Sequence, residues 1–211
     1  MNKSQLSIFI LSLFYFFGII GIAIPISRNI FAMITPLTLL LSLSLILYNH
    51  NSWNRPFIYA AIFCGIVGYL SEVIGVTTGL VFGEYSYGQT LGWQIFEVPI
   101  ILSINWLLLI YTSASVCNFL FSHLNIVLKA AISATLMVGL DFFIEPIAIA
   151  LDFWSWKYDT IPLQNYLGWL LIAFLLQLIF LNVFNKAEKN LVAIVVFGWQ
   201  IIFFGILNLF L

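Results

Sequence analysis

The amino-acid sequence predicts an all-α fold, a polytopic transmembrane bundle of about seven helices with its N-terminus inside. Two observations lead to this prediction. Of the 211 residues, 63% are hydrophobic and only 7% are charged, whereas a soluble domain carries about 25% charged residues because its surface faces water. The apolar residues also form runs close to the roughly 20 residues that a helix needs to cross the bilayer core. We therefore expect residues 1–211 to form a single transmembrane domain.

Seven apolar runs are separated by short breaks that contain polar residues, glycine or proline. They cover residues 6–24, 30–48, 57–79, 93–115, 125–150, 167–184 and 191–211. Backbone groups in hydrocarbon must be satisfied within their own segment, so each run is expected to be a helix. No small-residue cleavage site follows Lys3 within the first run, which is therefore expected to be a span rather than a signal peptide.

Basic residues are distributed unevenly over the two sides of a seven-span topology. One side holds five of them and the other holds two. The first set is Lys3, Arg55, Lys129, Lys186 and Lys189, and the second is Arg28 and Lys157. Lys and Arg in short loops accumulate on the cytoplasmic side, which places the N-terminus inside.

Two outer loops, at residues 83–88 and 152–158, are rich in aromatic residues. An interfacial aromatic belt would explain such loops. Each loop also carries two aromatics at thirteen and fifteen residues after an acid in the preceding run: Tyr85 and Tyr87 after Glu72, and Trp154 and Trp156 after Asp141. The two regions are therefore either parallel repeats, each an acid-bearing helix followed by an aromatic loop, or a coincidence of spacing.

Eight acidic residues are present, and six of them lie in or beside the third, fourth and fifth runs. These six are Glu72, Glu84, Glu97, Asp141, Glu145 and Asp152. A carboxylate at the centre of a spanning helix costs roughly 3 kcal/mol on insertion scales, and such residues usually face the bundle interior and mark function. Asp159 and Glu188 lie in loops and are expected to be solvated.

Glu72 shares one helical stripe with four glycines. The stripe runs i, i+3, i+7, i+10, i+14 through Gly65, Gly68, Glu72, Gly75 and Gly79. Small residues allow a neighbouring helix to approach closely, so Glu72 is expected to point into the bundle. A Glu that only hydrogen-bonds across this interface is the structural alternative.

Asp141 and Glu145 are spaced i, i+4 and therefore share one face of their helix. Neighbouring carboxylates without a cation on their helix cannot both ionise in a low-dielectric site, so at least one is expected to keep its proton. A retained proton is what a general acid needs. These two acids and Glu72 are the predicted catalytic residues.

Three other acids have simpler explanations. Glu97 precedes Pro99 and is expected at the N-terminal edge of a helix, where negative charge is favoured. Asp152 is expected to end the fifth span at the membrane interface. Glu84 is expected to be a solvated loop residue.

No metal site and no cofactor are expected. The sequence has no Walker motif, nucleophile elbow, His-Glu pair or CxxC motif, and His50 and His123 are isolated loop residues that we expect to be exposed. It also lacks the Asp-rich Mg²⁺ sites of diphosphate-using prenyltransferases and an obvious ligand set for haem or iron. The net charge of −1 gives no reason to expect a nucleic-acid partner.

A set of segments spread over about residues 60–175 forms a pattern that is specific in combination. It comprises Glu72–Tyr87, Leu91-Gly92, Val98-Pro99, Trp106, Asp141–Pro146, Trp154–Trp156, Pro162, Asn165-Tyr166 and Gly168-Trp169. The pattern resembles the carotenoid-biosynthesis membrane proteins that include the carotenoid 1,2-hydratases of the bacterioruberin and of the myxol and saproxanthin pathways. Two departures are Glu145, where that family is expected to have Asp, and Thr160-Ile161, where it is expected to have an aromatic–Gly pair.

The resemblance implies a lyase that hydrates the terminal C1–C2 double bond of an acyclic carotenoid such as lycopene. This step needs a desolvated acid to protonate C2 and a water for the C1 cation, and it needs no cofactor. We expect Asp141 and Glu145 to share the acid proton and Glu72 to position or deprotonate the water. Aromatic faces could stabilise the cation. The residues expected to bind substrate or orient water are Tyr85, Tyr87, Glu97, Trp154, Trp156 and Asn165.

The implied setting is a bacterial or archaeal cytoplasmic membrane. The expected partners are the carotenoid substrate, which arrives from the bilayer, membrane lipid and other enzymes of carotenoid synthesis. Three alternatives remain open. They are a membrane lycopene cyclase, which also protonates the substrate end, a carrier or transporter with a carboxylate relay, and a scaffold subunit without activity.

Overall fold

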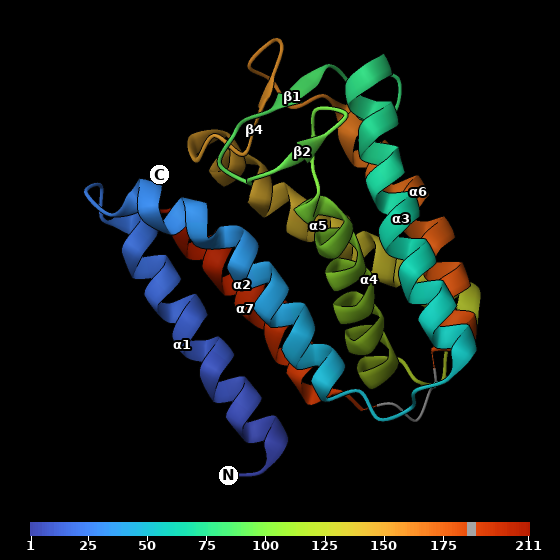
Figure 1. The fold of residues 1–211 in the computed structure, drawn as a ribbon. Helices are drawn as coiled ribbons and strands as arrows, with labels where there is room; N and C mark the ends of the chain where they lie inside the picture. Colours follow the sequence, from blue (N-terminus) through green and yellow to red (C-terminus); the bar gives the residue numbers. More distant parts are fainter. Residues whose placement is uncertain (185–188) are drawn as a thin grey trace.

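The computed structural model describes residues 1–184 and 189–211, which form a helical bundle with two small sheets near one end (Figure 1). The helices are α1 (Lys3–Ala23), α2 (Arg28–Tyr48), α3 (Arg55–Thr78), α4 (Ile101–Leu120), α5 (Ile126–Ala150), α6 (Leu163–Val183) and α7 (Leu191–Leu207). Strand β1 (Tyr85–Tyr87) pairs antiparallel with β4 (Trp154–Trp156), and β2 (Gln94–Ile95) with β3 (Val98–Pro99).

The prediction of an all-helical bundle with membrane-spanning helices is confirmed. Six of the described helices, α1 to α6, are long and apolar enough to cross a membrane, and α7 is a shorter apolar helix of 17 residues. Of the roughly seven predicted spans, six are therefore helices of sufficient length and apolar composition among the described residues.

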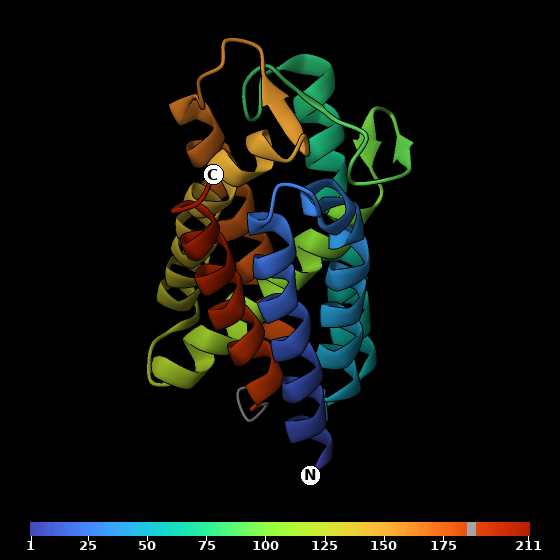
Figure 2. The ribbon, with the colours of Figure 1, turned by 90° about the vertical axis from the view of Figure 1, so that its left-hand side faces the viewer.

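Asparagine side chains cap the odd-numbered helices at their N-termini. The side chains of Asn2, Asn54, Asn125 and Asn190 each accept a hydrogen bond from the backbone N–H three residues later, which satisfies a group that a helix start otherwise leaves without a partner. These helices begin at the same end of the bundle, so β1 after α3 and β4 after α5 meet at the opposite end (Figures 1 and 2). The prediction that both aromatic loops share one side is thus confirmed.

Helix α4 is the centre of the bundle. It packs against α2, α3, α5, α6 and α7, and it is the most buried of the six long helices. Its sequence contains buried hydroxyls, yet Thr112, Ser113 and Ser115 each donate a hydrogen bond to the carbonyl four residues earlier. Because these polar groups are satisfied within their own helix, α4 can be buried on all sides.

The fourth apolar run is not helical along its whole length. The helix begins at Ile101 rather than near Pro99, because the preceding residues form the β2–β3 hairpin. Phe96 and Glu97 form the tight turn of this hairpin with positive φ angles of 52° and 62°. Glu97 is therefore an exposed turn residue, and its predicted place at a helix N-terminus is wrong.

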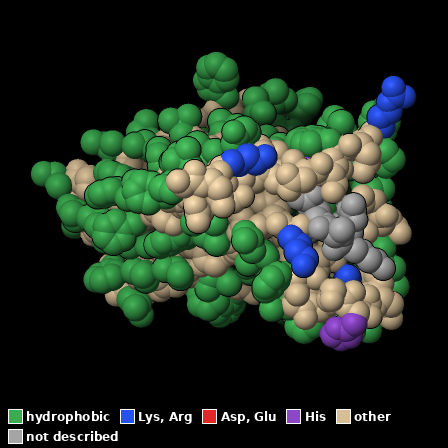
Figure 3. All heavy atoms as spheres, turned by 90° about the horizontal axis from the view of Figure 1, so that it is seen from below, with side chains coloured by type: hydrophobic (Ala, Val, Ile, Leu, Met, Phe, Trp, Pro, Cys, Tyr) green, Lys and Arg blue, Asp and Glu red, His purple; other side chains and the backbone are tan. Residues whose placement is uncertain are grey.

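Two loop predictions at the other end of the bundle also have clear outcomes. His123 is exposed as expected, but His50 is buried, with its ring stacked on Phe57 at 4.1 Å between centroids. Its Nδ1 lies 2.7 Å from the hydroxyl of Tyr111. Figure 3 views this end and shows basic side chains among hydrophobic ones. Glu188 lies outside the described residues.

The glycine stripe of α3 lies against a neighbouring helix, as predicted: its first two glycines, Gly65 and Gly68, face α4. A Cβ atom added to Gly68 would lie 2.3 Å from the ring of Trp106, and one added to Gly65 would lie 3.1 Å from the carbonyl oxygen of Ser103. Glu72, on the same stripe, is 2% exposed. The glycines thus allow the two helices to approach closely enough to enclose the Glu72 carboxylate.

The variant Gly68→Ala tests this close approach. The added methyl group would collide with the buried Trp106 ring, so we expect a loss of about 1–3 kcal/mol of stability and a melting temperature lower by about 2–4 °C per kcal/mol. The control is Gly139→Ala on α5, where a Cβ has no neighbour within 4 Å. Thermal unfolding of the purified protein in detergent measures both variants. Equal melting temperatures would show that the contact is not tight.

Candidate functional site

The three predicted catalytic carboxylates meet in one small pocket near the β1–β4 sheet. The pocket has a volume of about 30 Å³ and lies among α3, α4, α5 and α6. Glu72, Asp141 and Glu145 are each at most 3% exposed. The residues that line the pocket are Glu72, Phe82, Tyr85, Tyr87, Leu102, Asn105, Asp141, Ile144, Glu145, Trp154, Trp156, Asn165 and Trp169. A volume of this size has room for roughly one or two water molecules.

The Glu72 carboxylate accepts three hydrogen bonds from aromatic side chains. Its Oε2 accepts from the hydroxyls of Tyr85 at 2.6 Å and Tyr87 at 2.9 Å, and its Oε1 accepts from Trp106 Nε1 at 2.9 Å. Burial, and after it the charge of Glu72, raises the pKa of Tyr85 and of Tyr87 above its usual value. Both phenols therefore keep their protons and act as donors, so the Glu72 carboxylate is well solvated by the protein.

Asp141 and Glu145 share a single amide donor. Asn165 Nδ2 donates to Asp141 Oδ2 and to Glu145 Oε1, both at 3.0 Å. This bridge confirms that the i, i+4 pair presents both carboxyl groups on one face of α5. It also joins α6 to α5 at the level of the pocket.

The two acids differ in the remaining hydrogen bonds. Glu145 Oε2 accepts from the indole N–H groups of Trp154 at 3.0 Å and Trp156 at 2.9 Å. Asp141 accepts no further hydrogen bond from a described residue, and its Oδ1 is left for the pocket. Hydrogen bonds to a carboxylate favour its charged form. Of the two, Asp141 is therefore the better carrier of a proton.

The four aromatic donors come from the paired strands β1 and β4. Tyr85 lies opposite Trp156 and Tyr87 opposite Trp154, with Ser86 and Ser155 between them. Successive side chains of a strand point to opposite faces, so all four aromatics face the pocket while the serines, both exposed, face away. These residues do more than form an interfacial belt, because they supply hydrogen bonds to two buried carboxylates.

An exposed ion pair joins the two strands at one edge. Lys157 Nζ donates to the Glu84 carboxylate, and the Lys157 backbone N–H donates to the Glu84 carbonyl at 3.0 Å. The hydrogen bond to Glu84 raises the pKa of Lys157. Glu84 is a surface residue, as predicted, and so is Asp152, which follows the end of α5.

The two aromatic loops with the repeated spacing do pair, as strands β1 and β4. The acid that binds the aromatics of the second loop, however, is not the expected one. Trp154 and Trp156 bind Glu145, at intervals of nine and eleven residues, rather than Asp141 at thirteen and fifteen. Glu145 lies one helical turn after Asp141 and so is closer to the strand that follows the helix. The expected intervals of thirteen and fifteen residues hold only for Glu72 with Tyr85 and Tyr87.

Two tryptophans were not assigned roles from the sequence. Trp106 binds Glu72 and stacks on Trp169, with 4.2 Å between ring centroids and 9° between planes. The sequence feature that could have indicated Trp106 is Gly68 in the glycine stripe, because a glycine there makes room for a large side chain of the neighbouring helix. Glu97 is the one predicted binding residue that does not line the pocket.

The structure offers no evident metal centre in the part of the chain that it describes. No group of three or more His, Cys, Asp and Glu side chains is placed to hold a metal ion among those residues. The pocket instead combines carboxyl groups with N–H and O–H donors. Such an arrangement can hold a proton, a water molecule and a transient positive charge.

The variant Trp156→Phe tests whether the indole donors stabilise the buried carboxylate. It removes one hydrogen bond to Glu145 but keeps an aromatic ring, so we expect a loss of about 1–3 kcal/mol. Trp93→Phe is the control, because Trp93 is 88% exposed and should change little. Unfolding titrations with sodium dodecyl sulfate compare the two. A Trp156 variant as stable as the control would mean that the indole N–H is dispensable.

Comparisons with known proteins identify the family of this chain. The family described as carotenoid biosynthesis protein matches residues 10–211. A bisanhydrobacterioruberin hydratase from Haloarcula japonica is 29% identical over 128 residues, which cover 58% of this chain and 44% of the relative. The match thus spans less than half of that relative's length. No solved structure matches the chain. Because the family match covers residues 10–211, nearly the whole chain including the pocket, the chain belongs to the carotenoid biosynthesis protein family.

Proposed function

We propose that this protein is a carotenoid hydratase that adds water to the terminal C1–C2 double bond of an acyclic carotenoid. The reaction gives a tertiary 1-hydroxy group and uses no cofactor. The observation that carries the proposal is the convergence of three buried carboxyl groups with unequal hydrogen bonding in one pocket. The family and the name of the Haloarcula japonica relative support the substrate class.

In the proposed mechanism, Asp141 donates its proton to C2 of the substrate. A C2–H bond forms, the double bond is consumed, and C1 becomes a tertiary cation. The neighbouring Glu145 shares the amide donor of Asn165 with Asp141. In the proposed mechanism it helps to hold the Asp141 side chain in place and balances the positive charge of the C1 cation. The faces of Tyr87 and Trp154 line the pocket and can stabilise the cation.

Glu72 is proposed to act on the attacking water. Water forms the C1–O bond and passes a proton to Glu72, and return of that proton to Asp141 resets the site. The balance is one water added and no net change in the enzyme. The pocket holds roughly a water molecule rather than a branched hydrocarbon end, so substrate entry must displace apolar lining residues such as Phe82, Leu102 and Ile144.

We also propose the orientation in the membrane. Lys3, Arg55 and Lys189 lie at the end of the bundle where the odd-numbered helices begin, which favours an N-terminus inside. The pocket then lies toward the outer side of a bacterial or archaeal cytoplasmic membrane, within a single transmembrane domain. The carotenoid would enter from the bilayer, with other carotenoid-synthesis enzymes as partners.

Expression in cells that accumulate lycopene tests the reaction. We expect a product one water heavier whose oxygen comes from labelled water, and we expect Asp141→Asn or Glu72→Gln to lower conversion by about 100-fold or more. Asp159→Asn is the control, since Asp159 is exposed and outside the pocket. An isomeric cyclic product would indicate a cyclase instead. Full conversion by both pocket variants would contradict the assigned roles.

A further inference from the structure

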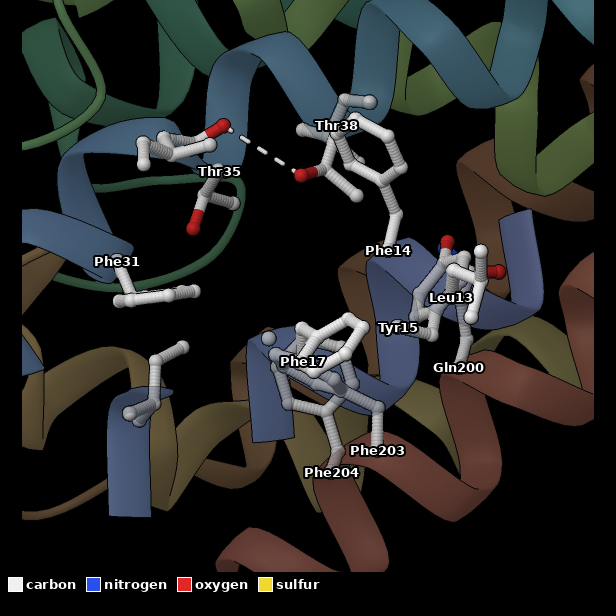
Figure 4. A pocket seen from close by; sticks show the side chains of 14 residues that line it. Leu13, Phe14, Tyr15, Phe17, Phe31, Thr35, Thr38, Gln200, Phe203 and Phe204 are labelled. Carbon is white, nitrogen blue, oxygen red and sulfur yellow. Dashed lines mark hydrogen bonds between the residues drawn. The ribbon is translucent and has the colours of Figure 1, made fainter. Parts of the chain in front are cut away.

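Two cavities of the bundle differ in the occupants that they favour. A partly exposed groove between α1, α2 and α7 has a volume of about 410 Å³ and is surrounded by phenylalanine and other mainly apolar side chains (Figure 4). A lining of this kind suits the hydrocarbon chains of the bilayer. Buried water needs two to four polar partners, which the carboxylate pocket of about 30 Å³ can provide. Water inside the protein is therefore expected in the carboxylate pocket.

Asn105 on α4 lines the carboxylate pocket but takes no part in the hydrogen bonds around the acids. The serine and threonine side chains of α4 each donate a hydrogen bond to the carbonyl three or four residues earlier; they are Ser103, Thr112, Ser113 and Ser115. The half-buried amide of Asn105, in contrast, forms no side-chain hydrogen bond with any described residue. An unsatisfied polar group in a membrane helix is costly, so this amide is expected to find its partner in the pocket.

Other polar atoms of the pocket are also open to a small occupant. Oδ1 of Asp141 and Oδ1 of Asn165 accept no hydrogen bond from a described residue, since the printed bonds of these two side chains use Oδ2 and Nδ2. Fully enclosed polar atoms without a hydrogen bond occur elsewhere, as in Gln177, but none is found among the residues that line the pocket. The free atoms of the pocket can therefore reach a bound molecule.

Glu72 keeps one acceptor position for such a molecule. An ionised carboxylate offers about four lone-pair positions, two on each oxygen. Among the described residues, Tyr85 and Tyr87 use both positions of Oε2, and Trp106 uses one position of Oε1. The second position of Oε1 remains. Because the pocket has room for only about one or two water molecules, Glu72 and Asn105, which both line it, converge on the same water.

We propose that Asn105 holds the water molecule that attacks the C1 cation. The water donates one O–H to the amide oxygen of Asn105 and the other to Oε1 of Glu72, so that a lone pair of its oxygen faces C1. When the C1–O bond forms, the proton on the Glu72 side passes to that carboxylate. The hydrogen on the Asn105 side stays in the new hydroxyl group. This inference rests on the proposed function, and it gives Asn105 control over the fate of the cation.

A cation without a positioned water has a different fate. It loses a proton from C2 or from a methyl group on C1 and returns to an unhydrated alkene. In heavy water the acid delivers a deuteron to C2, so an alkene formed in this way can carry one deuterium. The ratio of deuterated unhydrated carotenoid to hydrated product therefore reports on water capture alone, because both products follow the same protonation step.

Incubation of the full chain in detergent with lycopene in heavy water tests this role. Chromatography and mass spectrometry measure both products. Asn105→Leu keeps the size of the side chain and removes its polar atoms, so we expect the ratio to rise by about 100-fold, the scale on which a misplaced reactant slows a reaction. Asn105→Asp keeps an oxygen acceptor of the same reach, so the ratio should stay close to that of the wild type.

The matched control is Asn182→Leu. Asn182 is exposed near the end of α6, outside the pocket, and bonds only to the Leu178 carbonyl among the described residues, so the same substitution there should leave the ratio unchanged. Asn105→Ala serves as the test if Asn105→Leu does not fold. An unchanged ratio in Asn105→Leu, or an equal loss of both products, would overturn the assignment. A ratio in Asn105→Asp as high as in Asn105→Leu would also overturn it.

The proposed function and the role of Asn105 fail in different ways. If the wild type forms hydrated product and Asn105→Leu leaves the ratio unchanged, the role of Asn105 alone is wrong. If the wild type forms no hydrated product, the proposed function fails, and an experimental structure at a resolution that shows waters then decides the water site. A water bonded to both Asn105 and Glu72 in the wild type, and missing in Asn105→Leu, would support the site. Its absence from the wild type would overturn it.

Discussion

The structure depends on the need to solvate three carboxyl groups inside a membrane bundle. An acid in hydrocarbon is costly unless protein donors replace water. Glu72 and Glu145 each accept three hydrogen bonds, and all but one of the six donors are phenol or indole groups. Aromatic side chains can supply these donors without carrying charge into the bundle, since each joins an apolar ring to one polar group.

This requirement accounts for features that otherwise look unrelated. The β1–β4 pairing aims two aromatics from each strand at the pocket, and the glycine at position 68 makes room for the Trp106 ring. The surface pair Glu84–Lys157 and the bond from the Gly88 N–H to the Phe153 carbonyl, at 2.9 Å, hold the strands together outside the pocket. The sheet is small, but it fixes most of the donors around the acids.

The helices and the inward placement of the three acids were predictable because both follow from local periodicity. A glycine stripe indicates which side of a helix is packed, and an i, i+4 spacing places two acids on one face. Partners from distant segments were not predictable in this way. The burial of His50 depends on Phe57 and Phe184, which surround it from other elements. The β2–β3 hairpin was missed because its apolar residues, Ile95, Phe96 and Val98, directly precede the apolar helix that follows and were counted as part of the same run.

The unequal hydrogen bonding of the acids also bears on the choice between hydration and cyclisation. Both reactions begin with a proton from a carboxylic acid, but only hydration requires water beside the cation. The pocket has space for about one or two water molecules, and Glu72, which accepts three hydrogen bonds, lines it together with the Asp141–Glu145 pair. A cyclase would gain from a dry, apolar cavity in which the cation meets only a second double bond. With Asp141 as the proposed acid and Glu72 as the proposed base, this polar pocket favours the capture of water.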